Sequence, residues 1–229
     1  MRFIPKNRIT PDAFQAAVNG VTSYNNLYGN QKQALLKVLI EEQSGLCAYC
    51  NQPVTVNTAT VEHFICQSHS PSFDLKYFNL IAVCRGNPGN NVDLKHCDKY
   101  RAEKYKNDYF VPFFLFDKCL TQNLNSPNPF FDVEYNPRTQ LFSGRIIPRN
   151  QNMQGYPRNE SRIREAIDVL NLNAQVLVEA RKQKWYTVED TREKLGLTWE
   201  DLFQNYLNMP GAGFSEFILL AIRKKIQEP

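Results

Sequence analysis

The sequence predicts an α+β chain that is mainly helical and carries a small, cysteine-rich ββα-like segment and one additional β-hairpin. Apolar residues recur at helical spacing in the first and last parts of the 229-residue chain. β-Branched and apolar runs lie between residues 54 and 84 and again between residues 130 and 142. Five of the six cysteines fall within residues 47–97, which points to bound metal.

Two helices are expected before the first cysteine. Residues 11–20 begin like a short helix with Pro11 near its start. Residues 31–42 carry apolar side chains at helical spacing, and Ser44 with Gly45 is expected to end that helix. These apolar residues are Leu35, Leu36, Leu39 and Ile40.

A β-rich segment is expected after the first cysteine pair. Residues 54–56 and 58–61 are β-branched on either side of Asn57. Residues 77–84 form an apolar run, and the Gly, Asn and Pro residues of 85–93 predict a loop.

The remainder predicts a hairpin over residues 130–142 with its turn at 136–139, followed by helices. Helical spacing of apolar residues recurs at Ile163, Ala166, Ile167 and Leu170, and again at Phe214, Phe217, Ile218, Ala221 and Ile222. We divide the chain into an N-terminal helical segment (1–45), a zinc-braced core (46–110), and a β-hairpin plus C-terminal helical region (111–229). Trp185 and Trp199 are expected to pack within that last region.

Composition excludes several classes of protein. A hydrophobic fraction of 42% with 12% aromatic residues is typical of a globular chain and argues against disorder. The net charge of +4 is compatible with nucleic-acid binding but too small to indicate it. No apolar run is long enough to span a membrane, and Pro5 with its charged neighbours does not resemble a signal peptide. The sequence predicts a cytoplasmic protein with reduced cysteines.

Cys47 and Cys50 have the C-x-x-C spacing that lets one tight turn present two thiolates to a single ion. A tetrahedral zinc needs two more ligands, for which Cys84 and Cys97, at the edges of a loop, are the best candidates. His96 is an alternative ligand, and a redox pair is an alternative use of Cys47 and Cys50. A thioredoxin-like pair requires a βαβ context, which the sequence lacks.

Two other cysteines, Cys66 and Cys119, have no partner at metal spacing and are expected to pack as small apolar groups. His69 has only loop context and is assigned no role.

Polar residues with catalytic chemistry lie between the cysteine pairs. Histidine suits a general base because its pKa lies near neutrality, which favours His63. The adjacent Glu62, and Asp98 directly after the last cysteine, could bind a hard cation such as Mg²⁺. Adjacent strand residues point to opposite faces, so Glu62 and His63 can share a site only at a strand end or distortion. Asn79 follows in an apolar run.

The order of Cys47 and Cys50, Glu62-His63, Asn79, and Cys97-Asp98 with Arg101 resembles the HNH nuclease superfamily. Those enzymes share the ββα-metal fold, and many contain a four-cysteine zinc site. The resemblance implies that Glu62 binds metal, that His63 is the general base, and that Asn79 orients the base and secures the loop. Asp98 would be the third motif residue, where Asn or His is commoner, and Arg101 would match a Lys.

The segments 46–50, 61–64, 77–80 and 96–98, and more loosely 131–142 and 170–173 with Leu177 and Arg181, resemble the HNH subunit of Septu-type and retron-associated anti-phage systems. This resemblance implies a metal-dependent endonuclease with structural Zn²⁺ and catalytic Mg²⁺ or Mn²⁺, acting on DNA or RNA. It also implies an ATPase partner and, in retron systems, a reverse transcriptase complex. The alternative is a non-catalytic zinc-stabilised binding module.

A basic and aromatic stretch beside Asp98 could hold the phosphates on either side of a cleaved bond. Its members are Lys95, Lys99, Tyr100, Arg101, Lys104, Tyr105, Lys106 and Tyr109. Lys99 and Arg101 are the predicted substrate contacts, whereas Lys104 and Lys106 could equally belong to a solvated helix face.

Overall fold

The computed structural model describes residues 4, 6, 10–105, 130–136, 138–139, 141–149 and 159–227. The helices are α1 (Asp12–Ala17), α2 (Gly29–Glu42), α3 (Cys97–Lys104), α4 (Asn159–Val169), α5 (Gln175–Leu195), α6 (Trp199–Leu207) and α7 (Ser215–Gln227). The strands are β1 (Ala59–His63), β2 (Leu80–Cys84), β3 (Phe131–Tyr135) and β4 (Phe142–Pro148). The predicted α+β class is confirmed, with helices predominating and two antiparallel strand pairs. In the part of the chain that is described, no helix is both long and apolar enough to cross a membrane.

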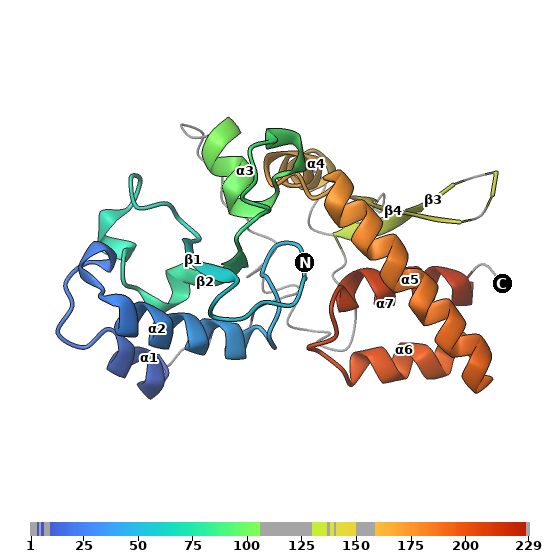
Figure 1. Ribbon diagram of the computed structural model, residues 1–229, viewed down its shortest axis with the longest axis horizontal. Helices are drawn as coiled ribbons and strands as arrows, with labels where there is room; N and C mark the ends of the chain where they lie inside the picture. The colour runs from blue at the N-terminus through green and yellow to red at the C-terminus, as the bar shows by residue number, and fades with distance from the viewer. Residues whose placement is uncertain are drawn as a thin grey trace.

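Helix α2 packs against the first strand pair, β1 and β2, and lies below it in Figure 1. Its apolar stripe of Leu35, Leu36 and Leu39 is buried, as the helical spacing predicted. Ser44 and Gly45 then take positive φ angles of 57° and 78°, which end the helix in the left-handed region. The buried Gln43 side chain joins this helix end to β2, since it donates to the Ala82 carbonyl at 2.7 Å and accepts from the Ala82 amide at 2.7 Å.

Strands β1 and β2 pair antiparallel, with Ala59 opposite Cys84 and His63 opposite Leu80. Every residue of β2 is buried, in keeping with its continuous apolar sequence. The prediction of a strand at residues 54–56 is wrong. The Thr55 carbonyl accepts from the amides of Thr58 and Ala59, so a hydrogen-bonded turn replaces extended pairing there.

Helix α3 follows β2 through a loop and packs against it, which completes a ββα arrangement. The second hairpin, β3–β4, confirms the one predicted over residues 130–142, and it packs on α4, α5 and α7. Trp185 and Trp199 stack with ring centroids 5.5 Å apart, so they pack within the helical region as expected.

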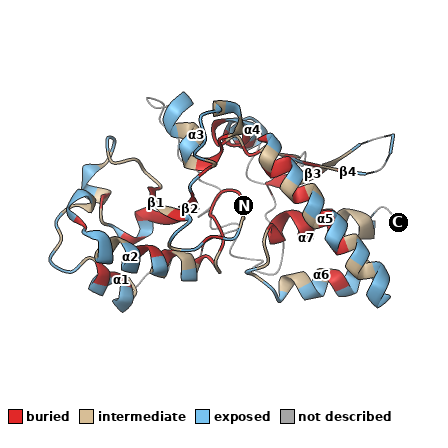
Figure 2. Cartoon of the chain, viewed as in Figure 1, coloured by how far each residue is buried: buried red, intermediate tan, exposed pale blue. Residues whose placement is uncertain are grey.

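The C-terminal region packs directly on the cysteine-bearing segments. The Cys97 amide donates to the Leu170 carbonyl at 2.7 Å, and the Phe214 amide donates to the Asn51 carbonyl at 2.8 Å. Figure 2 shows the buried residues running through β1 and β2 and, on the other side of the molecule, through α5 and α7. The zinc-ligand candidates therefore lie where the two halves meet.

Candidate active site and metal centre

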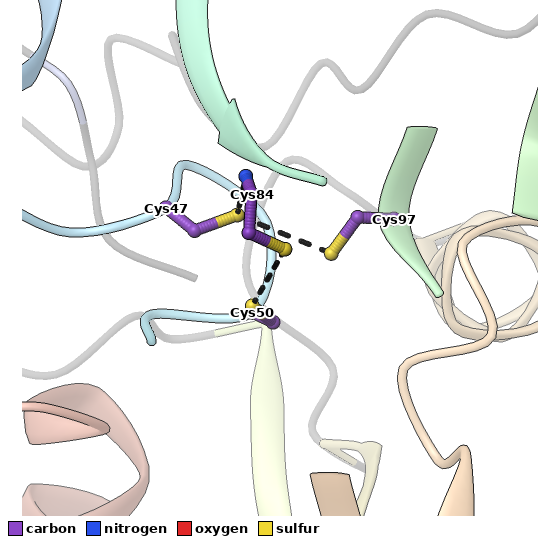
Figure 3. Close-up of side chains that lie close together, drawn as sticks. All are labelled: Cys47, Cys50, Cys84 and Cys97. Atoms are coloured by element: carbon purple, nitrogen blue, oxygen red, sulfur yellow. Dashed lines mark hydrogen bonds between the residues drawn. The ribbon is translucent and has the colours of Figure 1, made fainter. Parts of the chain in front are cut away.

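The structure brings together the four cysteines expected to bind zinc (Figure 3). Cys47 and Cys50 come from the turn after α2, Cys84 ends β2, and Cys97 begins α3. The turn is closed by a bond from the Cys47 amide to the Gln52 carbonyl and by Asn51, whose φ is 59°. All four sulfur atoms are buried and lie within 4.8 Å of one another.

The spacing of the sulfurs fits a tetrahedral zinc site. Sγ of Cys47 lies 3.9 Å from Sγ of Cys97, and Sγ of Cys50 lies 3.7 Å from Sγ of Cys84. Zn–S bonds of about 2.3 Å place the sulfurs of a tetrahedron about 3.8 Å apart. Burial raises the pKa of the Cys97 thiol, and the neighbouring thiols raise it further, because a second negative charge close by is unfavourable. The donor set therefore fits structural zinc.

His96 lies beside the cluster but outside the mutually close set of ligand atoms. Its Nδ1 is 3.3 Å from Sγ of Cys97 and 3.7 Å from Sγ of Cys84, within reach of an N–H···S contact. A second N–H···S contact comes from the Cys84 amide to Sγ of Cys47 at 3.3 Å. Such contacts stabilise thiolate charge and hold the sulfurs in orientation.

Gly86 allows the loop after β2 to return closely enough to place Cys97 beside Cys84. Its φ is 62°, and a Cβ built there would lie 2.1 Å from the His96 carbonyl oxygen. We expect Gly86→Ala to displace the His96–Cys97 segment and to lower zinc content markedly, measured by metal analysis of the purified protein. Gly89→Ala in the same loop is the control, because no atom lies within 4 Å of its Cβ position. Equal zinc content in the two variants would contradict this account.

Among the other cysteines, Cys66 is half-buried, and its Sγ lies 2.7 Å from Nδ1 of His69. It therefore makes a polar contact rather than the purely apolar packing expected from the sequence. Cys119 lies outside the described residues.

Glu62 is buried next to the end of β1 and faces helix α3. Its carboxylate accepts from the Tyr49 hydroxyl at 3.3 Å and from the Arg101 guanidinium, which also donates to Asp98 at 3.0 Å. Burial raises the pKa of Glu62, and the nearby Asp98 raises it further. A buried carboxylate with a second carboxylate beside it forms a pair that a hard divalent cation would stabilise.

His63 is the last residue of β1, so the Glu-His pair stands at a strand end, the geometry required for both to serve one site. Its Nε2 lies 3.0 Å from the Asp74 carbonyl and 3.2 Å from the Asp74 carboxylate, and its ring meets Tyr24 edge-on. Because the carbonyl only accepts, Nε2 carries the proton and Nδ1 is the basic nitrogen of the neutral ring. Burial lowers the pKa of His63, which keeps the ring neutral near pH 7.

Asn79 is completely buried and holds the loop between the two strands. Its Nδ2 donates to the carbonyls of Ile65 and Phe73 at 3.0 Å each, and its Oδ1 accepts from the Ile65 amide at 2.7 Å. These bonds secure the loop, whereas the direct contacts to His63 come from Asp74.

Asp74 is the site residue that sequence reasoning missed. The Asp74 carboxylate accepts from the Ser23 hydroxyl at 2.7 Å and from the Tyr24 amide at 2.6 Å, both through Oδ2. Its other oxygen, Oδ1, accepts from the Gln67 side chain. These contacts lower the pKa of Asp74 despite the opposing effect of burial. Asp74 lies eleven positions after His63, and no sequence motif links the two residues. They meet because the folded loop between them brings Asp74 back to the end of β1.

The predicted phosphate contacts have different environments. Lys99 is half-exposed and pairs loosely with Glu103 at 3.6 Å. Arg101 is largely buried and is directed at Glu62 and Asp98. Lys95 is buried and donates to Glu103 at 2.7 Å. Lys106 and Tyr109 lie outside the described residues.

We compared the sequence with protein-family models and with curated proteins. No family model matches the sequence. The chain is similar to a protein of Escherichia coli named as a candidate HNH endonuclease of retron Ec83, with 27% identity over 173 residues that cover 69% of this chain and 67% of that protein. The resemblance to retron-associated HNH endonucleases that the motifs predicted is thereby confirmed.

Proposed function

We propose that the chain is a metal-dependent HNH endonuclease that hydrolyses phosphodiester bonds of nucleic acid. The observation that supports this most is the buried constellation at the end of β1. There the neutral ring of His63 is held through Nε2 by Asp74. The preceding residue, Glu62, and Asp98 both form an ion pair with Arg101. Such an arrangement combines a positioned base with paired carboxylates.

In this proposal His63 removes a proton from the attacking water through Nδ1. The bond from Nε2 to the Asp74 carbonyl fixes the tautomer and stabilises the positive charge that develops on the ring. Asn79 keeps the loop that carries Asp74 in place through its three backbone contacts. Asn79 and Asp74 are then positioning residues, and His63 is the catalytic base.

Glu62 and Asp98 are the residues that would hold the catalytic cation. Mg²⁺ or Mn²⁺ bound there would neutralise charge on the scissile phosphate and on the leaving oxygen. Two protein carboxylates suit Mg²⁺, which keeps several of its waters and accepts substrate phosphate oxygens. Arg101 balances the two carboxylates in their present arrangement, and Lys99 is the more accessible cation for a flanking phosphate.

The biological setting is proposed from similarity alone. The relative is named for a retron, and the motif order resembles the HNH subunit of Septu-type systems. We therefore propose that this chain is the nuclease effector of an anti-phage complex, controlled by an ATPase partner together with retron components. The chemistry is assigned to residues 46–110, with 1–45 and 111–229 as supporting or docking regions.

The proposal is tested on the complex co-purified with its neighbouring gene products, incubated with DNA and with RNA in Mg²⁺ or Mn²⁺. We expect cleavage that a chelator of these ions abolishes. Glu62→Gln should cleave more slowly and need more Mg²⁺ for half-maximal rate, because it removes one anionic ligand. Glu41→Gln, at an exposed carboxylate on α2, is the control and should resemble the wild type. Absence of cleavage of either nucleic acid would favour the non-catalytic zinc module instead.

A further inference from the structure

One buried cation has no place in the proposed reaction. Arg181 lies on α5 with its side chain fully buried, and it is among the largest completely buried side chains in the described residues. A guanidinium removed from water is strongly unfavourable unless a counter-charge is near.

The direct hydrogen bonds of Arg181 go to neutral groups. Nη2 donates to the Leu172 carbonyl at 2.7 Å and Nη1 to the Gly144 carbonyl at 3.1 Å, while Nε has no partner in the structure. The ring of Phe217 lies 4.1 Å from Cζ. Across the described ranges of the chain, no carboxylate forms an ion pair with Arg181. Carbonyls and a ring face offer partial charges only.

Within the described residues, the segments that pack around Arg181 lead to the cysteine cluster. The Leu172 carbonyl that accepts from Arg181 is two residues from Leu170, whose carbonyl accepts from the Cys97 amide. On the other side, Phe214 lies beside the guanidinium and donates its amide to Asn51, directly after Cys50. Burial lowers the pKa of Arg181 to about 10, and charge on Cys50 and Cys97 acts in the opposite direction.

The net charge of a zinc-bound four-cysteine cluster is opposite in sign to the charge of Arg181. Four thiolates around Zn²⁺ carry two net negative charges, and here they are buried. We propose that Arg181 is the counter-charge of the zinc tetrathiolate and that it couples zinc binding to the docking of the C-terminal helices. Neither charge is then buried alone, and zinc affinity depends on a residue more than eighty positions from the last ligand. The proposal does not depend on whether the chain cleaves nucleic acid.

The test measures zinc release from full-length protein to a coloured chelator, together with the increase in melting temperature that zinc produces. Arg181→Met should release zinc at least about tenfold faster, in line with the usual effect of losing an outer partner of a metal ligand. Arg181→Lys keeps the charge and should stay close to wild type. Arg192→Met is the matched control, since Arg192 is also on α5 and lies over an aromatic ring, Trp199 at 4.5 Å.

A second comparison separates charge from packing and covers the case in which Arg181→Met folds poorly. Cys50→His lowers the net negative charge of the site by one, so Arg181→Met should cost less zinc retention and folded yield in that background than in the wild type. The proposal is overturned if the cost is the same in both backgrounds. It is also overturned if Arg181→Met holds zinc as firmly as Arg192→Met, or if Arg181→Lys loses zinc as readily as Arg181→Met.

Discussion

Replacing His63 with alanine is expected to lower the rate of nucleic-acid cleavage by about 10²–10⁴-fold, the usual contribution of a positioned general base. The ring contacts Asp74 and Tyr24, whereas the zinc-ligand candidates belong to a separate cluster. Zinc content should therefore be unchanged and the melting temperature only modestly lower. The measurement is a cleavage time course on the co-purified complex, with metal analysis and thermal unfolding on the same preparation.

His69→Ala is the matched control for that experiment. His69 is exposed in the loop that follows β1 and contacts Cys66. We expect this variant to cleave at the wild-type rate. A His63→Ala protein as active as His69→Ala would show that another group activates the water, and the assignment of His63 would have to be abandoned.

Replacing Cys47 with serine is expected to release the zinc and to destabilise the whole chain. Structural zinc contributes about 10–16 kcal/mol of apparent binding free energy in small zinc-dependent peptides, and that energy is coupled to folding. Even a loss of about 4 kcal/mol would lower the melting temperature by about 10 °C for a chain of this size. Both zinc content and thermal unfolding should change together.

Cys66→Ser is the appropriate comparison, because Cys66 is a free cysteine outside the four-sulfur cluster. It should keep its zinc and its melting temperature. A Cys47→Ser protein that does the same would remove the structural-zinc assignment and restore the redox-pair alternative for Cys47 and Cys50.

Local sequence patterns predicted most of the helices and strands. The helical spacing of Leu35, Leu36 and Leu39 predicted α2, and the alternation around residues 131–142 predicted the second hairpin. The pattern failed at residues 54–56. β-Branched residues favour strands, but the Thr55 carbonyl instead accepts from the Thr58 amide and closes a turn directly after the isolated bridge between Leu46 and Pro53.

The four cysteines and the order of Glu62-His63 and Asn79 could be recognised in the amino-acid sequence, because metal and motif spacings are short-range properties of the chain. The groups that surround these residues depend on how distant segments of the chain fold together. Asp74 reaches His63 through the loop between β1 and β2, and Arg181 is buried on α5, far along the chain from the cysteines. Asp74 and Arg181 are both charged groups whose properties depend on burial. That burial results from contacts between segments that lie far apart along the chain.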